Sequence, residues 1–224
     1  MRIENILKNG FLYNIFQNLT GWKNVSDGGE FLTLPKTEGR RCRVLDIGCG
    51  PGTQVWRFMD AEYYGFDLNE QNIRMAQRKY KSYPNLRFFH ADVSAYFNTG
   101  NFTESDCFDL EFMLGVLHHL SDDETASCVS SVKKLLRPAK KNVPDSGNGG
   151  GELRTVDVVD LPQKSAFTGF LLRHDRGKFV RTEEGYVSLL KPHFSNIETR
   201  VFTNIIRLPI PLIFIKCTEP TGRC

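Results

Sequence analysis

Apolar residues follow a strand-like pattern in five segments of the chain and a helical pattern in the segments between them. Compact apolar runs predict strands within residues 42–48, 62–68, 86–93, 106–120 and 151–160. Helical spacing predicts helices at residues 53–61, 69–84 and 121–138. Strands that alternate with helices indicate an α/β fold, in which helices cover both faces of a parallel sheet.

Two of these helices carry boundary signals that are independent of the apolar pattern. Asn69 can cap the helix at 69–84, and Pro84 marks its end. Ser121 and Glu124 have the spacing of a capping box at the start of the next helix.

The pattern changes at both ends of the chain. Residues 3–20 predict an amphipathic helix, because Glu4 and Asn5 would interrupt the apolar core of a signal peptide. After residue 160 we expect one clear helix at 182–191, then an antiparallel pair of strands at 197–203 and 210–217 at a sheet edge. Residues 139–151 are rich in lysine, proline, serine and glycine, which predicts a mobile loop within a single domain.

Composition narrows the class of partner. The 224 residues are 40% hydrophobic and 25% charged, with a net charge of +3, which does not indicate nucleic acid or an anionic membrane as a partner. No run of 18 apolar residues occurs, so a transmembrane helix is not predicted. Six cysteines without C-x-x-C or zinc-like spacing predict reduced thiols, a cytoplasmic protein and no metal site.

The stretch RVLDIGCGPGT, residues 43–53, predicts a loop that a ligand approaches closely. Gly48, Gly50 and Gly52 follow a strand and precede a helix, and they alternate along the chain. The dinucleotide fingerprint G-x-G-x-x-G needs two residues before its last glycine, and a P-loop needs a following G-K-[ST]. Neither pattern is present, so the glycines alone leave the ligand open.

Three aspartates at the ends of successive strands narrow the choice of ligand. Asp46 next to the glycines disfavours a phosphate and favours an ammonium group. Asp67 lies about 20 residues further on, where a carboxylate accepts ribose hydroxyls. Asp92 is placed to accept a hydrogen bond from an exocyclic amine, as on adenine. A ligand with an amino acid end, a ribose and an adenine, but no phosphate, fits all three.

These motifs resemble those of the class I S-adenosylmethionine-dependent methyltransferases. VLDIGCGPGT is similar to their first motif, YYGFDL and FHADV to the next two, and FDLEFMLGVLHHLSDD to the fourth-strand motif. The resemblance implies a Rossmann-like, doubly wound sheet of seven strands, mostly parallel with an antiparallel C-terminal strand. It also implies S-adenosylmethionine as the cofactor, with no metal.

The resemblance implies a division of the single domain and a set of cofactor contacts. A helical lid would span residues 1–39, the cofactor core 40–160, a substrate cap 161–196 and the terminal strand pair 197–217. Asp67 would hold the ribose, Asp92 and the Val93 N–H the adenine, and the backbone around residues 113 and 114 the methionyl ammonium. The implied contacts are Asp46, Gly48, Cys49, Gly50, Gly52, Asp67, Leu68, Asp92, Val93, Met113 and Leu114.

Candidate residues for the chemistry lie after the fourth strand. An alcohol acceptor needs a general base, whereas an ionised acid or a carbon nucleophile does not. His118 is the first candidate base and His119 the second, since imidazole titrates near neutral pH, with a packing role as the alternative. Candidate substrate contacts are Tyr13, Arg173, His174 and Tyr186, and Arg176 and Arg181 are further candidates for binding an anion. The alternatives are core positions for the tyrosines and a solvated basic face for the arginines.

The function predicted from the sequence is methyl transfer to a small-molecule acceptor, at oxygen, by a cytoplasmic monomer or homodimer. A methyltransferase for RNA or protein is one alternative, although EFMLGVLHH lacks the Asn/Asp-Pro-Pro-aromatic element common in enzymes that methylate base amines. A regulatory protein that binds the cofactor without catalysis is the other.

Overall fold

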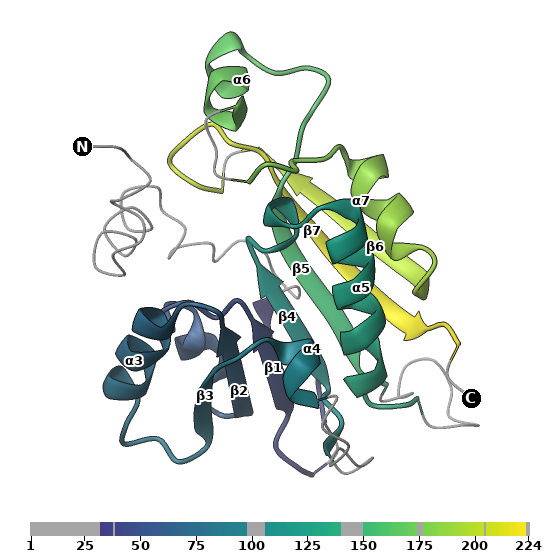
Figure 1. Cartoon of the computed structure of the whole chain (residues 1–224). Helices are drawn as coiled ribbons and strands as arrows, with labels where there is room; N and C mark the ends of the chain where they lie inside the picture. The colour runs from purple at the N-terminus through teal and green to yellow at the C-terminus, as the bar shows by residue number, and fades with distance from the viewer. Residues whose placement is uncertain are drawn as a thin grey trace.

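Seven strands form one sheet in the computed structural model, which describes residues 32–37, 39–97, 106–139, 150–173, 177–203 and 205–222. The strand order is β3-β2-β1-β4-β5-β7-β6 (Figure 1). Every neighbouring pair is parallel except those made by β7, which runs antiparallel to both β5 and β6. The strands are β1 (Arg43–Ile47), β2 (Glu62–Asp67), β3 (Leu86–His90), β4 (Leu110–Leu114), β5 (Glu152–Val158), β6 (Phe194–Phe202) and β7 (Leu212–Pro220). The predicted Rossmann-like, mostly parallel fold is confirmed.

Helices cover both faces of this sheet, as the alternating pattern predicts. Short 3₁₀ helices are η3 (Val55–Phe58), η5 (Leu117–His119) and η6 (Lys133–Leu135), and the α-helices are α3 (Glu70–Lys79), α4 (Val93–Phe97), α5 (Asp122–Val132), α6 (Ala166–Arg173) and α7 (Glu183–Leu190). One apolar cluster joins η3 and α3 to the sheet, and the other joins α4, α5 and α7 to it. Figure 1 shows α5 and α7 side by side on the second face.

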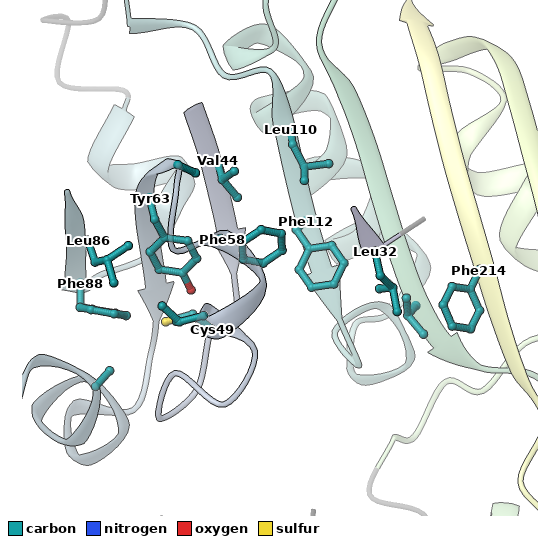
Figure 2. Packing of buried hydrophobic residues seen from close by; sticks show 14 of the residues in the cluster. Leu32, Val44, Cys49, Phe58, Tyr63, Leu86, Phe88, Leu110, Phe112 and Phe214 are labelled. Atoms are coloured by element: carbon teal, nitrogen blue, oxygen red, sulfur yellow. The ribbon is translucent and has the colours of Figure 1, made fainter. Parts of the chain in front are cut away.

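The first cluster is built around aromatic side chains from strands and from η3. The rings of Phe58 and Tyr63 lie 5.9 Å apart, and those of Phe58 and Phe112 lie 5.4 Å apart (Figure 2). Leu32 packs into the same cluster from the segment before β1. The burial of these large side chains supports the edge of the sheet from which the glycine loop emerges.

Two predicted helix starts are confirmed in detail. The Asn69 Oδ1 accepts a hydrogen bond from the Gln71 N–H at 2.9 Å. Ser121 and Glu124 form the reciprocal capping box, with the Glu124 carboxylate accepting from the Ser121 N–H at 2.8 Å. These bonds satisfy N–H groups that a helix start leaves unpaired, so each helix begins at a defined distance from the preceding strand or loop.

The prediction differs from the structure at short helices. The helix predicted at 53–61 is reduced to the four residues of η3, while α4 and α6 were not predicted. Both are too short for apolar periodicity to distinguish them, and α6 contains Gly169, a residue that disfavours a helix. The helix at 3–20, most of the 139–151 loop, and Tyr13, His174 and Arg176 lie outside the described residues. Within the described ranges, no helix is long and apolar enough to cross a membrane.

Candidate functional site

The alternating glycines have a conformational cause. Gly48, Gly50 and Gly52 adopt φ values of +75°, +56° and +74°, in the left-handed region that side chains disfavour. Space is restricted as well, because a Cβ on Gly48 would lie 2.7 Å from Val116 Cγ2 and one on Gly52 would lie 2.9 Å from the Tyr80 ring. The loop therefore takes left-handed conformations at three alternate residues, and at Gly48 and Gly52 neighbouring side chains fill the space that a Cβ would need.

Hydrogen bonds to β2 fix the position of this loop. The Gly48 and Cys49 N–H groups both donate to the Phe66 carbonyl, at 2.8 and 3.0 Å. The Gly50 N–H donates to Asp67 Oδ2 at 2.9 Å, and the Asn69 N–H donates to Asp67 Oδ1 at 2.7 Å. Asp67 is half-buried, and Oδ1 also lies 3.4 Å from Asn72 Nδ2, so the second lone pair of Oδ2 is the one without a donor among the described contacts. Asp67 thus orients the loop and can still accept a hydrogen bond from a ligand.

Asp46, predicted as a cofactor contact, is a buried residue of β1. Strand alternation turns its side chain into the layer that also holds Tyr63, and only 3% of the residue is exposed. The Tyr63 hydroxyl donates a hydrogen bond to Asp46 Oδ2 at 2.6 Å. The Asp46 carboxyl group is therefore buried and hydrogen-bonded to Tyr63, and one residue of β1 separates Asp46 from the start of the glycine loop.

Burial raises the pKa of Asp46 to about 7, the Tyr63 hydrogen bond opposes this rise, and the nearby Asp67 adds to it. An unfolded aspartate has a pKa of about 3.9, so the folded chain binds more protons between roughly pH 4 and 7. The free energy of unfolding attributable to Asp46 should therefore fall as pH rises through this window.

Asp46→Asn is expected to remove this part of the pH dependence while keeping an acceptor for Tyr63. Urea unfolding followed by fluorescence at pH values on either side of the window measures the difference between the two proteins. The wild type should lose more stability toward high pH than the variant, by a few kcal/mol at most. Equal pH slopes for the two proteins would contradict the assignment.

The remaining predicted cofactor residues lie along the carboxyl edges of β2, β3 and β4. Leu68 is 72% exposed beside Asp67, which leaves an apolar surface at this edge. Asp92 is exposed and caps α4 by accepting from the Ala95 N–H at 2.9 Å, and Val93 is buried directly after it. Met113 is buried in the second cluster and Leu114 is half-buried at the end of β4. Their contacts with a cofactor stay predictions.

A buried histidine–aspartate pair lies at the carboxyl ends of β4 and β5. His118 Nδ1 lies 2.8 Å from Asp157 Oδ1, and the His118 backbone N–H donates to the same oxygen at 3.1 Å. His118 is 5% exposed and Asp157 is fully buried. Because a carboxylate only accepts, Nδ1 carries the proton and Nε2 is the nitrogen with the lone pair.

The segment after α6 covers this pair. A Cβ on Gly177 would lie 2.0 Å from His118 Cδ2, so the Gly177 backbone lies directly on the imidazole. The Phe179 N–H also donates to the His118 carbonyl at 3.0 Å. This cover keeps water away from the pair, and a low local dielectric strengthens the hydrogen bond between the two side chains.

A family model for the methyltransferase domain matches residues 44–139. This match identifies residues 44–139 as a methyltransferase domain. The matched residues include the glycine loop, Asp67 at the end of β2, Asp92 after β3, and the turn with His118. This match confirms the resemblance to the class I S-adenosylmethionine-dependent methyltransferases. The match, together with a structural neighbour solved with SAM, supports S-adenosylmethionine as the cofactor.

Sequence and structure comparisons also find methyltransferases among the proteins similar to this chain. The chain is 29% identical over 115 residues to the sterol 24-C-methyltransferase of Candida albicans, across 48% of this chain and 28% of the relative. Matches cover only 38% and 28% of the lengths of the curated relatives. The DhpI–SAM–HEP complex has a TM-score of 0.61 at 16% identity over 97% of this chain and 95% of that one. The mitomycin 7-O-methyltransferase MmcR has a TM-score of 0.61 at 17% identity, over 95% of this chain and 60% of that one. These structural likenesses show the fold.

The structure describes three more of the residues predicted for the acceptor side, and it places one of them in the core and two at the surface. Tyr186 is 1% exposed, and its hydroxyl donates to the Val158 carbonyl at 2.8 Å, which is the core position given as the alternative to a substrate contact. A helix aromatic that packs on the sheet is core here. Arg173 is exposed at the end of α6, and His119 is exposed with its ring 4.2 Å from that of His118.

The sequence analysis missed Asp157 as a partner of His118. The available signal was an aspartate inside the strand segment ELRTVDV, which forms β5 and whose seven residues all prove to be buried. A carboxylate at such a position needs a hydrogen-bonding partner, which the strand pattern alone cannot identify.

Proposed function

We propose that this chain transfers a methyl group from S-adenosylmethionine to an oxygen atom of a small-molecule acceptor. The buried His118–Asp157 pair is the observation that carries the choice of oxygen. An alcohol or phenol must lose a proton as it is methylated, and an imidazole held by a carboxylate is suited to take that proton. A carbon acceptor or an ionised acid would not require this arrangement.

The loop and strand ends described above fit the cofactor. Asp67 Oδ2 has a lone pair left for a ribose hydroxyl, and the exposed Leu68 offers an apolar contact to an adenine ring. The left-handed glycines let the loop pack closely on Val116 and Tyr80 beside Asp67. The bound cofactor would supply an electrophilic methyl group on a positively charged sulfur.

The chain's own groups would perform three tasks in this reaction. The loop and Asp67 would fix the donor, and His118 Nε2 would accept the proton of the acceptor hydroxyl. Asp157 would hold the Nδ1 tautomer and stabilise the imidazolium that forms. The segment at Gly177 would exclude water from the imidazole.

Substrate discovery tests the proposed function directly. The protein is incubated with methyl-labelled S-adenosylmethionine and fractionated cell metabolites, and mass spectrometry identifies what gains the label. We expect a small hydroxylated compound to be labelled. Label found only in RNA or protein would overturn the acceptor class, and salt-dependent RNA binding would point to the nucleic-acid alternative. Tight cofactor binding without any transfer would favour the regulatory alternative.

Asp67→Ala is expected to weaken S-adenosylmethionine binding at least about tenfold, because hydrogen bonds to a charged acceptor are lost and the loop amide of Gly50 loses its anchor. Calorimetric titration measures the effect. Asp60→Ala is the matched control, since this exposed carboxylate precedes β2 at the opposite edge of the sheet. Unchanged affinity in a folded Asp67→Ala protein would remove Asp67 from the cofactor site.

A further inference from the structure

Arg181 connects the end of β5, which carries Asp157, to the η5 turn, which carries His118. Its backbone bridges to Val159, and its carbonyl accepts a hydrogen bond from the Asp160 N–H at 2.9 Å. Both partners directly follow β5, two and three residues after Asp157. Arg181 is therefore fixed to the strand end that supplies the carboxylate.

The guanidinium group of Arg181 reaches the loop that supplies the imidazole. Nη1 donates to the Leu117 carbonyl at 3.0 Å, and Nη2 donates to the Leu120 carbonyl at 2.7 Å. These carbonyls lie on either side of His118 and His119 along the chain. Arg181 therefore holds both ends of the 3₁₀ turn in which His118 sits.

The other donors of Arg181 are occupied as well. Nη1 also donates to the Phe179 carbonyl at 3.0 Å, and Nε and Nη2 donate to Asp122 Oδ1 at 3.0 and 2.7 Å. A guanidinium has five N–H groups, and these five hydrogen bonds account for all of them. The side chain is only 9% exposed. Arg181 has no donor left for an anionic substrate, which excludes the role considered from the sequence.

The packing around the guanidinium restricts it further. Its central carbon lies 5.8 Å from the centre of the Phe179 ring and 5.7 Å from that of the Tyr186 ring. Tyr186 in turn is fixed to β5 through its hydrogen bond to the Val158 carbonyl. Burial raises the pKa of Tyr186 far above its ordinary value, Asp157 raises it further and Arg181 opposes the rise. The η5 turn is thus packed against one group of side chains, which consists of Arg181, Tyr186 and Asp157.

We propose that Arg181 is a positioning residue that holds the His118 imidazole against Asp157 and thereby fixes its proton on Nδ1. This inference rests on the proposed function, in which His118 acts as the base. Arg181 acts through the Leu117 and Leu120 carbonyls and does not contact the reacting atoms. A lysine could not replace it, because a point-like ammonium cannot donate in these directions at the same time.

Nitrogen-15 NMR of the imidazole rings tests the proposal without requiring an acceptor. The full chain is labelled at histidine, and the ring shifts of His118 report which nitrogen carries the proton. We expect the wild type to show a single Nδ1–H form. Arg181→Ala and Arg181→Lys should both give mixed tautomers, approaching the signal of Asp157→Ala, in which the ring has lost its partner.

Two controls distinguish positioning of the His118 ring from a general loss of protein stability. One is rescue by free guanidinium ion, and the other is removal of an arginine far from His118. Guanidinium ion at a concentration far below the denaturing range should restore the Nδ1–H signal to Arg181→Ala, whereas sodium chloride at equal concentration should not. Arg78→Ala removes an exposed arginine on α3 and should leave the His118 signal as in the wild type. A folded Arg181→Lys protein with the wild-type His118 signal would overturn the proposal, even where Arg181→Ala does not fold.

Turnover gives a second readout once an acceptor is known. We expect Arg181→Lys to lower kcat about 10- to 100-fold with KM for the acceptor nearly unchanged, because a misplaced base slows proton transfer rather than binding. A change in KM alone would overturn the positioning role. If NMR shows the dependence on Arg181 but the wild type methylates no hydroxyl, the positioning of His118 stands and the proposed function fails.

Discussion

Alanine in place of Gly48 is expected to weaken S-adenosylmethionine binding at least about tenfold, and this is the largest effect we expect from a single added methyl group. A φ of +75° disfavours any side chain by about 1–2 kcal/mol. The new Cβ would also lie 2.7 Å from Val116 Cγ2, closer than carbon atoms approach in folded proteins. Either the glycine loop or the segment before His118 must therefore move. Calorimetric titration with S-adenosylmethionine measures the result.

Gly39→Ala is the matched control for this prediction. Gly39 has a similar φ of +67°, but a Cβ there would meet no heavy atom within 4 Å. It should lower the thermal stability through backbone strain and leave cofactor affinity unchanged. If Gly48→Ala bound the cofactor as tightly as Gly39→Ala, the close packing of the glycine loop on Val116 would have no role in the site.

Removal of the imidazole at position 118 should have the largest effect on catalysis. His118→Gln is expected to lower the rate of methyl transfer about 10²- to 10⁴-fold, which is the range that general base catalysis supplies. Asp157→Asn should have an effect of similar size, because an amide can donate to Nδ1 and favour the wrong tautomer. Methyl transfer to the identified acceptor, followed with labelled cofactor, gives the rates.

Two comparisons make this second prediction specific. Cofactor affinity should stay within about twofold of the wild type in both variants, since neither side chain belongs to the cofactor contacts. His119→Gln should lose far less activity, because this adjacent imidazole is exposed and no hydrogen bond joins it to Asp157 among the described contacts. A full rate in His118→Gln would show that the acceptor needs no base, and would redirect the search to carbon or to ionised acids.

The sheet and the cofactor side were predictable because their signals are local in sequence. The glycines at 48, 50 and 52 each need a left-handed backbone, and Asp67 ends the adjacent strand. Chain order then places both at one edge of the sheet, since parallel neighbours share their carboxyl ends. The capping box at Ser121 is likewise a pattern of four residues.

The acceptor side was less predictable because it depends on contacts between distant segments. Asp157 is 39 residues from His118, and Arg181 joins them through main-chain carbonyls that any residue could provide. A sequence pattern does not record such bonds. The burial of Tyr186 and Asp46 was not predicted for a related reason, as the direction of a side chain depends on the register of the strands and helices around it.

The place of β7 has a consequence for how the protein is made. A ribosome synthesises β5 and β6 before β7, yet β7 lies between them and provides all the pairing that β6 has among the described strands. A nascent chain without residues 212–220 would expose the unpaired edge of β5, a surface prone to association with other chains. We therefore expect this half of the sheet to form only after β7 has left the ribosome, and to be the part that chaperones protect during translation.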